Sequence, residues 1–473
     1  MGTINSAFSL ISGALNADQA ALSIIANNVA NASTPGYADE TPNWQENQPV
    51  TINGVQFGAG VTETGAISLR DRVLEQRLDQ QQQLASSSGA RLSALNSIQA
   101  LFTPDSGSAS SSAGDIGSDI TSFFSSFASL EANPTNNSLR EEVLSSAKTL
   151  AGDVSNAAAS LNQQSSALDQ QSSGVTAQVN SLTTSLAKLN QQIQTTSPNG
   201  DAGPLEDQRQ QDLSQLSQLI GINQITTEHN GISVTTTSGQ TLVSENTSFQ
   251  MTSGTVSGAT HFFVGNTDVT AQLASGGGQL GGYLTARDQD ITGAMNSLDQ
   301  LAYSVSTQVN ALNNAGTDLN GVTGSVASPL NIFSQPITLS GSAVSMSVVM
   351  TDPNQIAAAS AGAGTGDNSN ATAMANLAAK TIVAGQTPTD FFSNFASTLG
   401  ATVSGVQDEN SAQNASVSQL QTQNNALSSV NLNDEAAAMS TLQTSYQAAS
   451  QVFSMLNTVM QSALNLGTET TVA

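Results

Sequence analysis

The chain of 473 residues has no cysteine and only two histidines, His229 and His261. Disulfide scaffolds, thiolate metal sites and cysteine nucleophiles are therefore excluded. Neither histidine has the spacing of a metal ligand, and no Gly-x-Ser-x-Gly nucleophile motif is present. We expect both histidines to be surface or strand residues, and we expect no catalytic residues, no metal and no cofactor.

Basic residues are also scarce. Ten lysines and arginines face 35 acidic residues, which gives a net charge of −25, and Lys380 is the one basic residue after Arg287. Nucleic acid is an improbable partner because phosphate binding needs clustered basic side chains. Anionic membrane surfaces are disfavoured for the same reason.

The sequence has no long apolar run, since no uninterrupted stretch reaches the roughly 18 residues of a membrane helix. No lysine or arginine precedes Arg70, so a secretory signal is not expected either. Aromatic residues make up 4% of the chain, with Trp44 the single tryptophan, and charged residues only 10%. Serine, threonine, asparagine and glutamine supply the polar surface, which suits a protein that packs against many copies of itself.

Heptad patterns are present at both ends of the chain. Near the N-terminus, apolar residues recur at a and d positions over about four heptads, with Asp18 as the one polar exception. A second pattern runs from Met439 to Ala463. An amphipathic helix needs a partner to cover its apolar face, so the two ends pair with each other, with other copies, or with both; ordinary helices of one bundle are the alternative.

The middle of the chain alternates between helical and extended patterns. The sequence predicts hairpin-like structure over 38–66, a helix from about Ile67 to Leu101, a Ser/Gly linker over 104–117, and an unbroken helix over 139–195. Period-two patterns with turn signals predict short strands from about Ile222, and two or three more within 337–349.

These patterns predict a multidomain α+β protein. A long-helix bundle, with the N- and C-terminal helices paired as a coiled coil, carries a small all-β domain in the middle. The expected units are 1–37 with 425–473 for the paired ends, and 38–220 with 279–424 for a mainly helical part that includes extended hairpin segments. The β domain is expected over 221–278, with 322–352 as a candidate addition.

Three short motifs resemble ligand sites, and in each case a structural role is favoured. Gly276-Gly277-Gly278 lacks the Lys-Ser/Thr of a phosphate loop and reads as a junction. Asp318, Asn320 and Gly321 lack the later ligands of a calcium loop and predict a turn. Asp434-Glu435 is best explained as charge that complements a helix N-terminus.

The stretch from Ala26 to Tyr37, Ala-Asn-Asn-Val-Ala-Asn-Ala-Ser-Thr-Pro-Gly-Tyr, resembles the N-terminal signature of the flagellar rod, hook and hook-associated protein family. Further segments are similar to the hook-associated branch and follow one another in the same order. These are Gly58–Val61 with Arg70-Asp71, Phe123-Phe124, Asn133-Pro134 with Leu139-Arg140, Leu189–Ile193, Leu205–Arg209, Gly281–Leu284 with Arg287-Asp288, Val430–Ala437, and Tyr446–Ala449. The chain departs from the pattern at Ala38-Asp39-Glu40, where a basic residue usually follows the tyrosine, and at Ala438–Thr441.

The resemblance implies a non-catalytic structural adaptor that joins flagellar hook to filament, its terminal helices lining an inner tube. It implies export through the flagellar type III apparatus to an extracellular place on the bacterial flagellum, where the protein serves motility. The implied partners are the hook protein, a second hook–filament junction protein, other copies in a ring-like lattice, and an export chaperone at the C-terminal region, without membrane insertion. Another axial protein of the rod or hook is the alternative, followed by a secreted helical adhesin.

The residues expected to form the assembly interface belong to the two heptad patterns and the turns beside them. On the N-terminal side they are Ile4, Phe8, Ile11, Leu15, Leu22, Ile25, Val29, Asn27, Asn28, Asn31, Thr34, Pro35, Gly36 and Tyr37; on the C-terminal side they are Asn431, Asp434, Glu435, Met439, Leu442, Tyr446, Ala449, Phe453, Leu456 and Met460.

Overall fold

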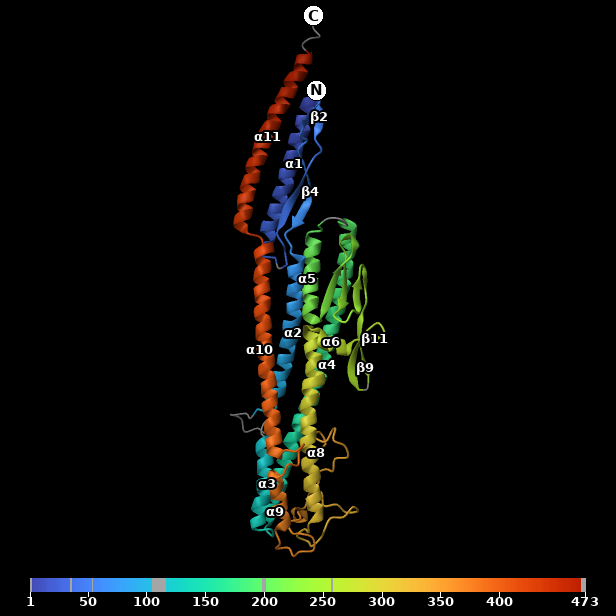
Figure 1. The fold of residues 1–473 in the computed structure, drawn as a ribbon, viewed down its shortest axis with the longest axis vertical. Coiled ribbons are helices and arrows are strands. Elements are labelled where there is room, and N and C mark those ends of the chain that lie inside the picture. The colour runs from blue at the N-terminus through green and yellow to red at the C-terminus, as the bar shows by residue number, and fades with distance from the viewer. Residues whose placement is uncertain are drawn as a thin grey trace.

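The computed structural model describes residues 2–34, 36–52, 54–103, 116–197, 201–256 and 258–468. Pro35 and the linker residues 104–115 lie outside these ranges. The molecule is a long rod, with the start of α1 and the end of α11 at the same tip (Figure 1). Its helices are α1 (Gly2–Asn31), α2 (Arg72–Ala100), α3 (Ile116–Ala132), α4 (Asn137–Thr196), α5 (Pro204–Leu219), α6 (Thr270–Gly276), α7 (Gly278–Thr285), α8 (Thr292–Ala315), α9 (Ser369–Ala375), α10 (Pro388–Ser428) and α11 (Leu432–Thr468).

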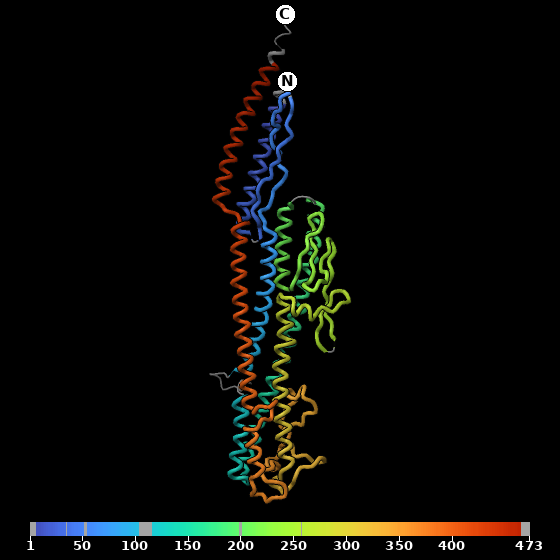
Figure 2. Tube along the Cα trace, in the orientation of Figure 1, coloured from blue at the N-terminus to red at the C-terminus, as the bar shows by residue number. Residues whose placement is uncertain are grey.

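The shaft of the rod is built from helices that are distant in the sequence. Helices α2 and α10 pack along each other, as do α3 with α4 and α4 with α5. Helix α4 is continuous over 60 residues, about 90 Å at 1.5 Å per residue, so the prediction of an unbroken central helix is confirmed. The Cα trace in Figure 2 shows α10 and α2 side by side beneath the terminal helices.

Two apolar clusters hold the shaft together. The lower one joins α3, the first half of α4, α8 and the start of α10, and includes Phe123, Phe127 and Phe333. The upper one joins the second half of α4 to α5, α7 and the strands, and includes Val179 and Phe262. Arg140, 1% exposed, caps the lower end by donating hydrogen bonds to the carbonyl oxygens of Pro134 and Ile356.

The strands form four small antiparallel sheets. They are β1 (Glu40–Glu46) with β4 (Val61–Ser68), β2 (Val50–Ile52) with β3 (Val55–Phe57), the order β5-β6-β7-β8 (Ile222–Thr226, Ile232–Thr236, Thr241–Ser244, Thr247–Ser248), and the order β11-β10-β9 (Thr267–Asp268, Ala259–Val264, Met251–Val256). The inner side chains of β5–β10 share their apolar cluster with α4, α5 and α7. This β region is therefore built onto the helices and has no separate core of its own.

The structure corrects two predictions about elements. Residues 337–349 form no strands; Phe333 and Val348 make an isolated bridge, and Ala343, Met346 and Met350 pack into the lower helical cluster. The segment 322–352 consequently does not join the β region. Helix α2 begins at Arg72, later than Ile67, because Asp71 accepts hydrogen bonds from the backbone N–H groups of Val73 and Leu74, while Ile67 belongs to β4.

The glycine-rich motifs serve close packing. Gly277 and Gly278, at φ of +94° and +72°, link α6 to α7, and a Cβ on Gly278 would lie 2.4 Å from the Ile220 Cα. A Cβ on Gly282 would lie 2.2 Å from the Ser87 carbonyl oxygen, so α7 approaches α2 with no room for a side chain. Asp318 accepts hydrogen bonds from the N–H groups of Asn320 and Val322, as expected for a turn.

Candidate assembly interface

Helices α1 and α11 lie side by side in opposite directions at the tip of the rod (Figure 1). The Phe8 and Phe453 rings meet with their centroids 4.5 Å apart. Along α1, Phe8, Ile11, Leu15 and Leu22 are half-buried and Ile25 is buried. Along α11, the half-buried residues include six expected ones: Met439, Leu442, Ala449, Phe453, Leu456 and Met460. Helices α1 and α11 are therefore in contact, with Phe8 and Phe453 meeting between them.

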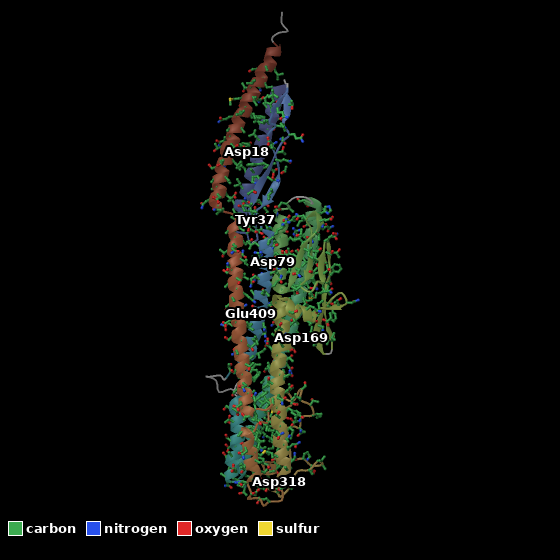
Figure 3. All side chains as sticks on the ribbon, viewed as in Figure 1. Asp18, Tyr37, Asp79, Asp169, Asp318 and Glu409 are labelled. Carbon is green, nitrogen blue, oxygen red and sulfur yellow. The ribbon has the colours of Figure 1, made fainter. Side chains whose placement is uncertain are left out.

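Not every expected residue lies between the two helices. Val29 is 41% exposed and Tyr446 is 38% exposed. Ile4 lies in α1, with its side chain outside the described part of the chain. Asp18 is 9% exposed, and its Oδ2 has no hydrogen-bond partner among the described residues; its position midway along α1 is labelled in Figure 3.

The other side of α1 lies against the β1–β4 hairpin. Ala17 and Ala21 are buried there at 4% and 0% exposure. Gly13 comes so near that an added Cβ would lie 3.5 Å from the Val61 carbonyl oxygen. Helix α1 is thus the middle layer of three, with α11 on one side and the hairpin on the other.

Asn28 is the polar centre of the turn that follows α1. The side chain is fully buried. Its Nδ2 donates to Asp39 Oδ1 at 2.7 Å and to the Glu40 carbonyl oxygen at 2.8 Å, and its Oδ1 accepts from the Tyr37 hydroxyl at 2.7 Å and the Glu40 N–H at 3.1 Å. All four hydrogen-bonding positions of the amide are used, so this residue holds the end of α1 to Tyr37, Asp39 and the start of β1.

The remaining residues of the turn support Asn28. Asn27 donates to the Tyr37 hydroxyl at 3.3 Å, Asn31 donates to Asn27, and Thr34 donates to Asn31. Gly36 has φ of +82°, in the region that glycine tolerates. Burial and the neighbouring carboxylates Glu40 and Asp207 raise the pKa of Tyr37 well above its ordinary value, so the hydroxyl stays a donor throughout the physiological range.

Asp39 connects this turn to the C-terminal part of the chain. Its N–H donates to the Ser428 carbonyl oxygen at 2.8 Å, at the end of α10. Its carboxyl shares a hydrogen bond with Glu435, which is 8% exposed in the first turn of α11. Burial raises the pKa of both carboxyls. Asp434 is exposed and accepts a hydrogen bond from Asn431 at 2.8 Å.

A cluster of buried charges, which sequence reasoning did not assign to the site, lies directly below. Arg70, with a side chain 5% exposed, forms ion pairs with Glu75 at 2.5 Å and with Asp207, and donates to the Gly36 carbonyl oxygen at 3.2 Å. Arg72 pairs with Glu206 at 2.7 Å. The sequence did point to these residues, because Arg70 and Asp207 lie in the segments Arg70-Asp71 and Leu205–Arg209 that resemble the family.

A cleft of 540 Å³ separates the turn from the shaft. It is bordered by residues 32–34 and 36–38, by α2 and α5, and by the end of α10. Asp79 lies in its wall at 2% exposure and accepts hydrogen bonds from Gln210 at 3.1 Å and Gln224 at 2.9 Å. Burial without a cationic partner raises the pKa of Asp79 to about 6. Uncharged polar residues, glutamine, asparagine, serine and threonine, supply more than half of the lining, and the cleft is a joint between parts of the chain.

The histidines take no part in this region. His229 lies in a turn after β5, and His261 lies in β10 with its Nδ1 2.6 Å from Asp268 Oδ2. Among the described residues no group of three or more His, Cys, Asp or Glu side chains is arranged to hold a metal ion.

Helix α1 is more apolar than its interrupted pattern indicates. From Ser6 to Asn31 it is long and apolar enough to cross a membrane by length and composition alone. This corrects the expectation drawn from uninterrupted runs. Most residues of this helix are at least half-buried between α11 and the hairpin, and few are fully buried in a single chain.

Comparison with known proteins shows what this chain is similar to. Residues 105–326 match the family described as Flagellar hook-associated protein FlgK helical domain, and residues 11–37 match the family described as Flagella basal body rod protein. The chain is 28% identical over 331 residues to flagellar hook-associated protein 1 of Salmonella typhimurium, which covers 67% of this chain and 58% of that protein. It is 26% identical over 321 residues to the Escherichia coli protein of the same name, covering 66% and 57%.

A solved structure has the same fold. The flagellar hook junction protein FlgK from Burkholderia pseudomallei superposes with a TM-score of 0.65 at 18% identity, covering 74% of this chain and 99% of that one. The helical-domain match includes α3 to α8 of the shaft, and the rod-protein match ends at Tyr37, where the Asn28 turn closes. The chain is therefore similar to flagellar hook-associated protein 1 over about two thirds of its length, and it shares the fold of the solved FlgK structure.

Proposed function

We propose that this protein is a structural, non-catalytic adaptor that joins the flagellar hook to the filament. The observation that carries the proposal is the three-layer tip, in which the apolar α1 is only partly buried and most of its partner α11 is exposed in one chain. Exposed apolar surface of this extent is typical of proteins that assemble. The similarity to hook-associated proteins indicates that this assembly is the flagellum.

The terminal helices would continue the inner tube as a coiled coil, completed by neighbouring copies. The opposed heptads and the contact of Phe8 with Phe453 support this arrangement. The hook protein on one side and a second junction protein on the other would then contact the ring of copies. The shaft would form the shell around the tube, and the β region built on α4 and α5 would face solvent.

Deletion of the coding sequence in the source bacterium tests the role. The expected result is cells with hooks but no filaments, with filament protein shed into the medium, and recovery when the full-length chain is restored. Complete filaments in the deletion strain would overturn the proposal. A rod or hook role is the alternative; it predicts that hooks are also lost, and the match to the helical domain over 105–326 weighs against it.

Insertion of α1 into a membrane is the rival explanation of the same apolar helix. Asp18 in mid-helix and the packing of Ala17 and Ala21 against strands argue for a protein environment. Flotation of the purified chain with uncharged lipid vesicles separates the two ideas. A chain that remains with the soluble fraction supports assembly, whereas α1-dependent flotation would support the membrane.

We also propose export through the flagellar type III apparatus, with an export chaperone bound to the C-terminal region before assembly. The exposed α11 supports this, because its apolar residues need cover while the chain awaits its neighbours. A pull-down with the last 40 or so residues removed tests the site. Undiminished capture of the chaperone by the shortened chain would rule out α11.

A further inference from the structure

Two uncharged apolar surfaces lie on the outside of the three-layer tip. One is the outer stripe of α11, defined as Ala448, Val452, Met455 and Val459, whose last three members are 42%, 60% and 53% exposed. The other is the hairpin tip, defined as residues 47–61, where Val50, Val55 and Phe57 are 46%, 56% and 51% exposed. Neither residues 47–61 nor residues 436–468 contain a charged side chain.

The outer stripe is one of two distinct exposed faces of α11. Its residues recur at steps of four, three and four, so they share a side of the helix. The polar face, defined as Gln443, Gln447, Ser454, Thr458 and Gln461, is exposed too. Glutamine and serine side chains hydrogen-bond to water, whereas exposing a row of valine and methionine side chains to water is unfavourable. The stripe therefore marks the side on which α11 has a further partner.

The two surfaces lie on opposite sides of the molecule and cannot meet within one chain. Helix α1 separates them, with α11 to its left and the hairpin to its right in Figure 1. They nevertheless lie at the same height along the rod. Phe8 touches Phe453 on one side of α1, and Leu10 and Gly13 lie against Gly60 and Val61 on the other.

We infer that the hairpin tip of one copy covers the outer stripe of α11 in the next copy. Because the surfaces are different and lie on opposite sides, the contact is head-to-tail and leaves one of each surface free at every step. The matched heights allow copies to follow one another around an axis parallel to the rod. This inference rests on the proposed function, since it specifies how neighbouring copies in the assembly touch.

Engineered cysteines test the contact in a chain that has none of its own. The variant Val55→Cys/Met455→Cys is expressed in the source bacterium without its native copy, and isolated flagella are treated with a short bismaleimide. A ladder of dimers, trimers and larger species on a denaturing gel is expected, with at least half of the chain leaving the monomer band. The matched control Val55→Cys/Gln447→Cys, which uses the polar face of the same helix, should remain monomeric.

The outcomes separate the inference from the function. The head-to-tail contact is overturned if the double variant is incorporated but stays monomeric, or if the single variant Val55→Cys forms dimers. Either result leaves the adaptor role intact. Absence of the unmodified chain from isolated flagella overturns the adaptor role. If the double variant is not incorporated, purified Val55→Cys and Met455→Cys chains are mixed at high concentration; a mixed dimer supports the contact, and its absence overturns it.

Discussion

Phe8 and Phe453 bring the two ends of the chain together, with ring centroids 4.5 Å apart between α1 and α11. Phe453→Ala removes this contact. We expect the local stability of the helix pair to fall by about 1–3 kcal/mol. The half-buried ring contributes by removing apolar surface from water, and its contact with the second aromatic ring adds to that contribution. Amide hydrogen exchange in α11 should speed up while exchange in α4 stays unchanged. The control Ser454→Ala, on the exposed polar face, should leave both rates alone.

Asn28 is the residue on which the turn after α1 depends. Asn28→Ala leaves the Tyr37 hydroxyl, the Asp39 carboxyl and the Glu40 N–H without their partner. Unsatisfied buried groups of this kind cost about 1–3 kcal/mol each, so protease cleavage between α1 and β1 should increase at least tenfold. Thr34→Ala, which removes one exposed hydrogen bond, is the matched comparison. Equal cleavage of both variants would contradict the central role of Asn28.

Arg70 and Arg72 are neighbours with different burial, which allows a paired test. Arg70→Met leaves Glu75 and Asp207 buried without their cation, and we expect a loss of about 3–5 kcal/mol in the free energy of unfolding. Arg72 has a side chain 54% exposed, so Arg72→Met should cost less than about 1 kcal/mol. Denaturant titration of both variants measures the difference, and similar losses would contradict the assignment.

Asp79 makes stability depend on pH. Its folded pKa of about 6 lies above the ordinary 3.8, so the folded state holds a proton that the unfolded state has released between these values. Stability from this group is therefore present below about pH 4 and is lost as the pH rises to about 6. Asp79→Asn keeps an oxygen for Gln210 and Gln224 without the charge. Relative to the parent, the variant should gain up to about 3 kcal/mol between pH 4 and pH 7; a constant difference in thermal or denaturant midpoints would refute this.

Arg140 ties the lower end of the shaft. Arg140→Met removes the donors to the carbonyl oxygens of Pro134 and Ile356, and a loss of about 2–4 kcal/mol is expected because those buried oxygens lose their charged partner. The exposed neighbour Glu141 provides the control Glu141→Gln, for which the unfolding midpoint should not change. A Met variant as stable as the parent would mean that water replaces the guanidinium there.

Sequence patterns predicted the helices and the hairpin that are specified by residues close together in the chain. The opposed heptads led to the half-buried residues of α11 from Met439 to Met460, because a repeat of 3.5 residues specifies one face of a helix without reference to its partner. The same reasoning predicted α4 and the hairpin after Tyr37. It failed over 337–349, where alternating apolar residues pack into the lower helical cluster, since a period of two does not say whether a pairing strand exists.

What the sequence alone determined is the charge, the absence of cysteine, the apolar helix faces and the turn sequence around Asn28. The tertiary structure decided which distant segments meet: Asp39 with Glu435, Arg70 with Asp207, and α1 between α11 and the hairpin. The physical reason is that periodicity and propensity act over a few residues. Buried charges and hydrogen-bonded amides are satisfied only by groups that folding brings from elsewhere in the chain.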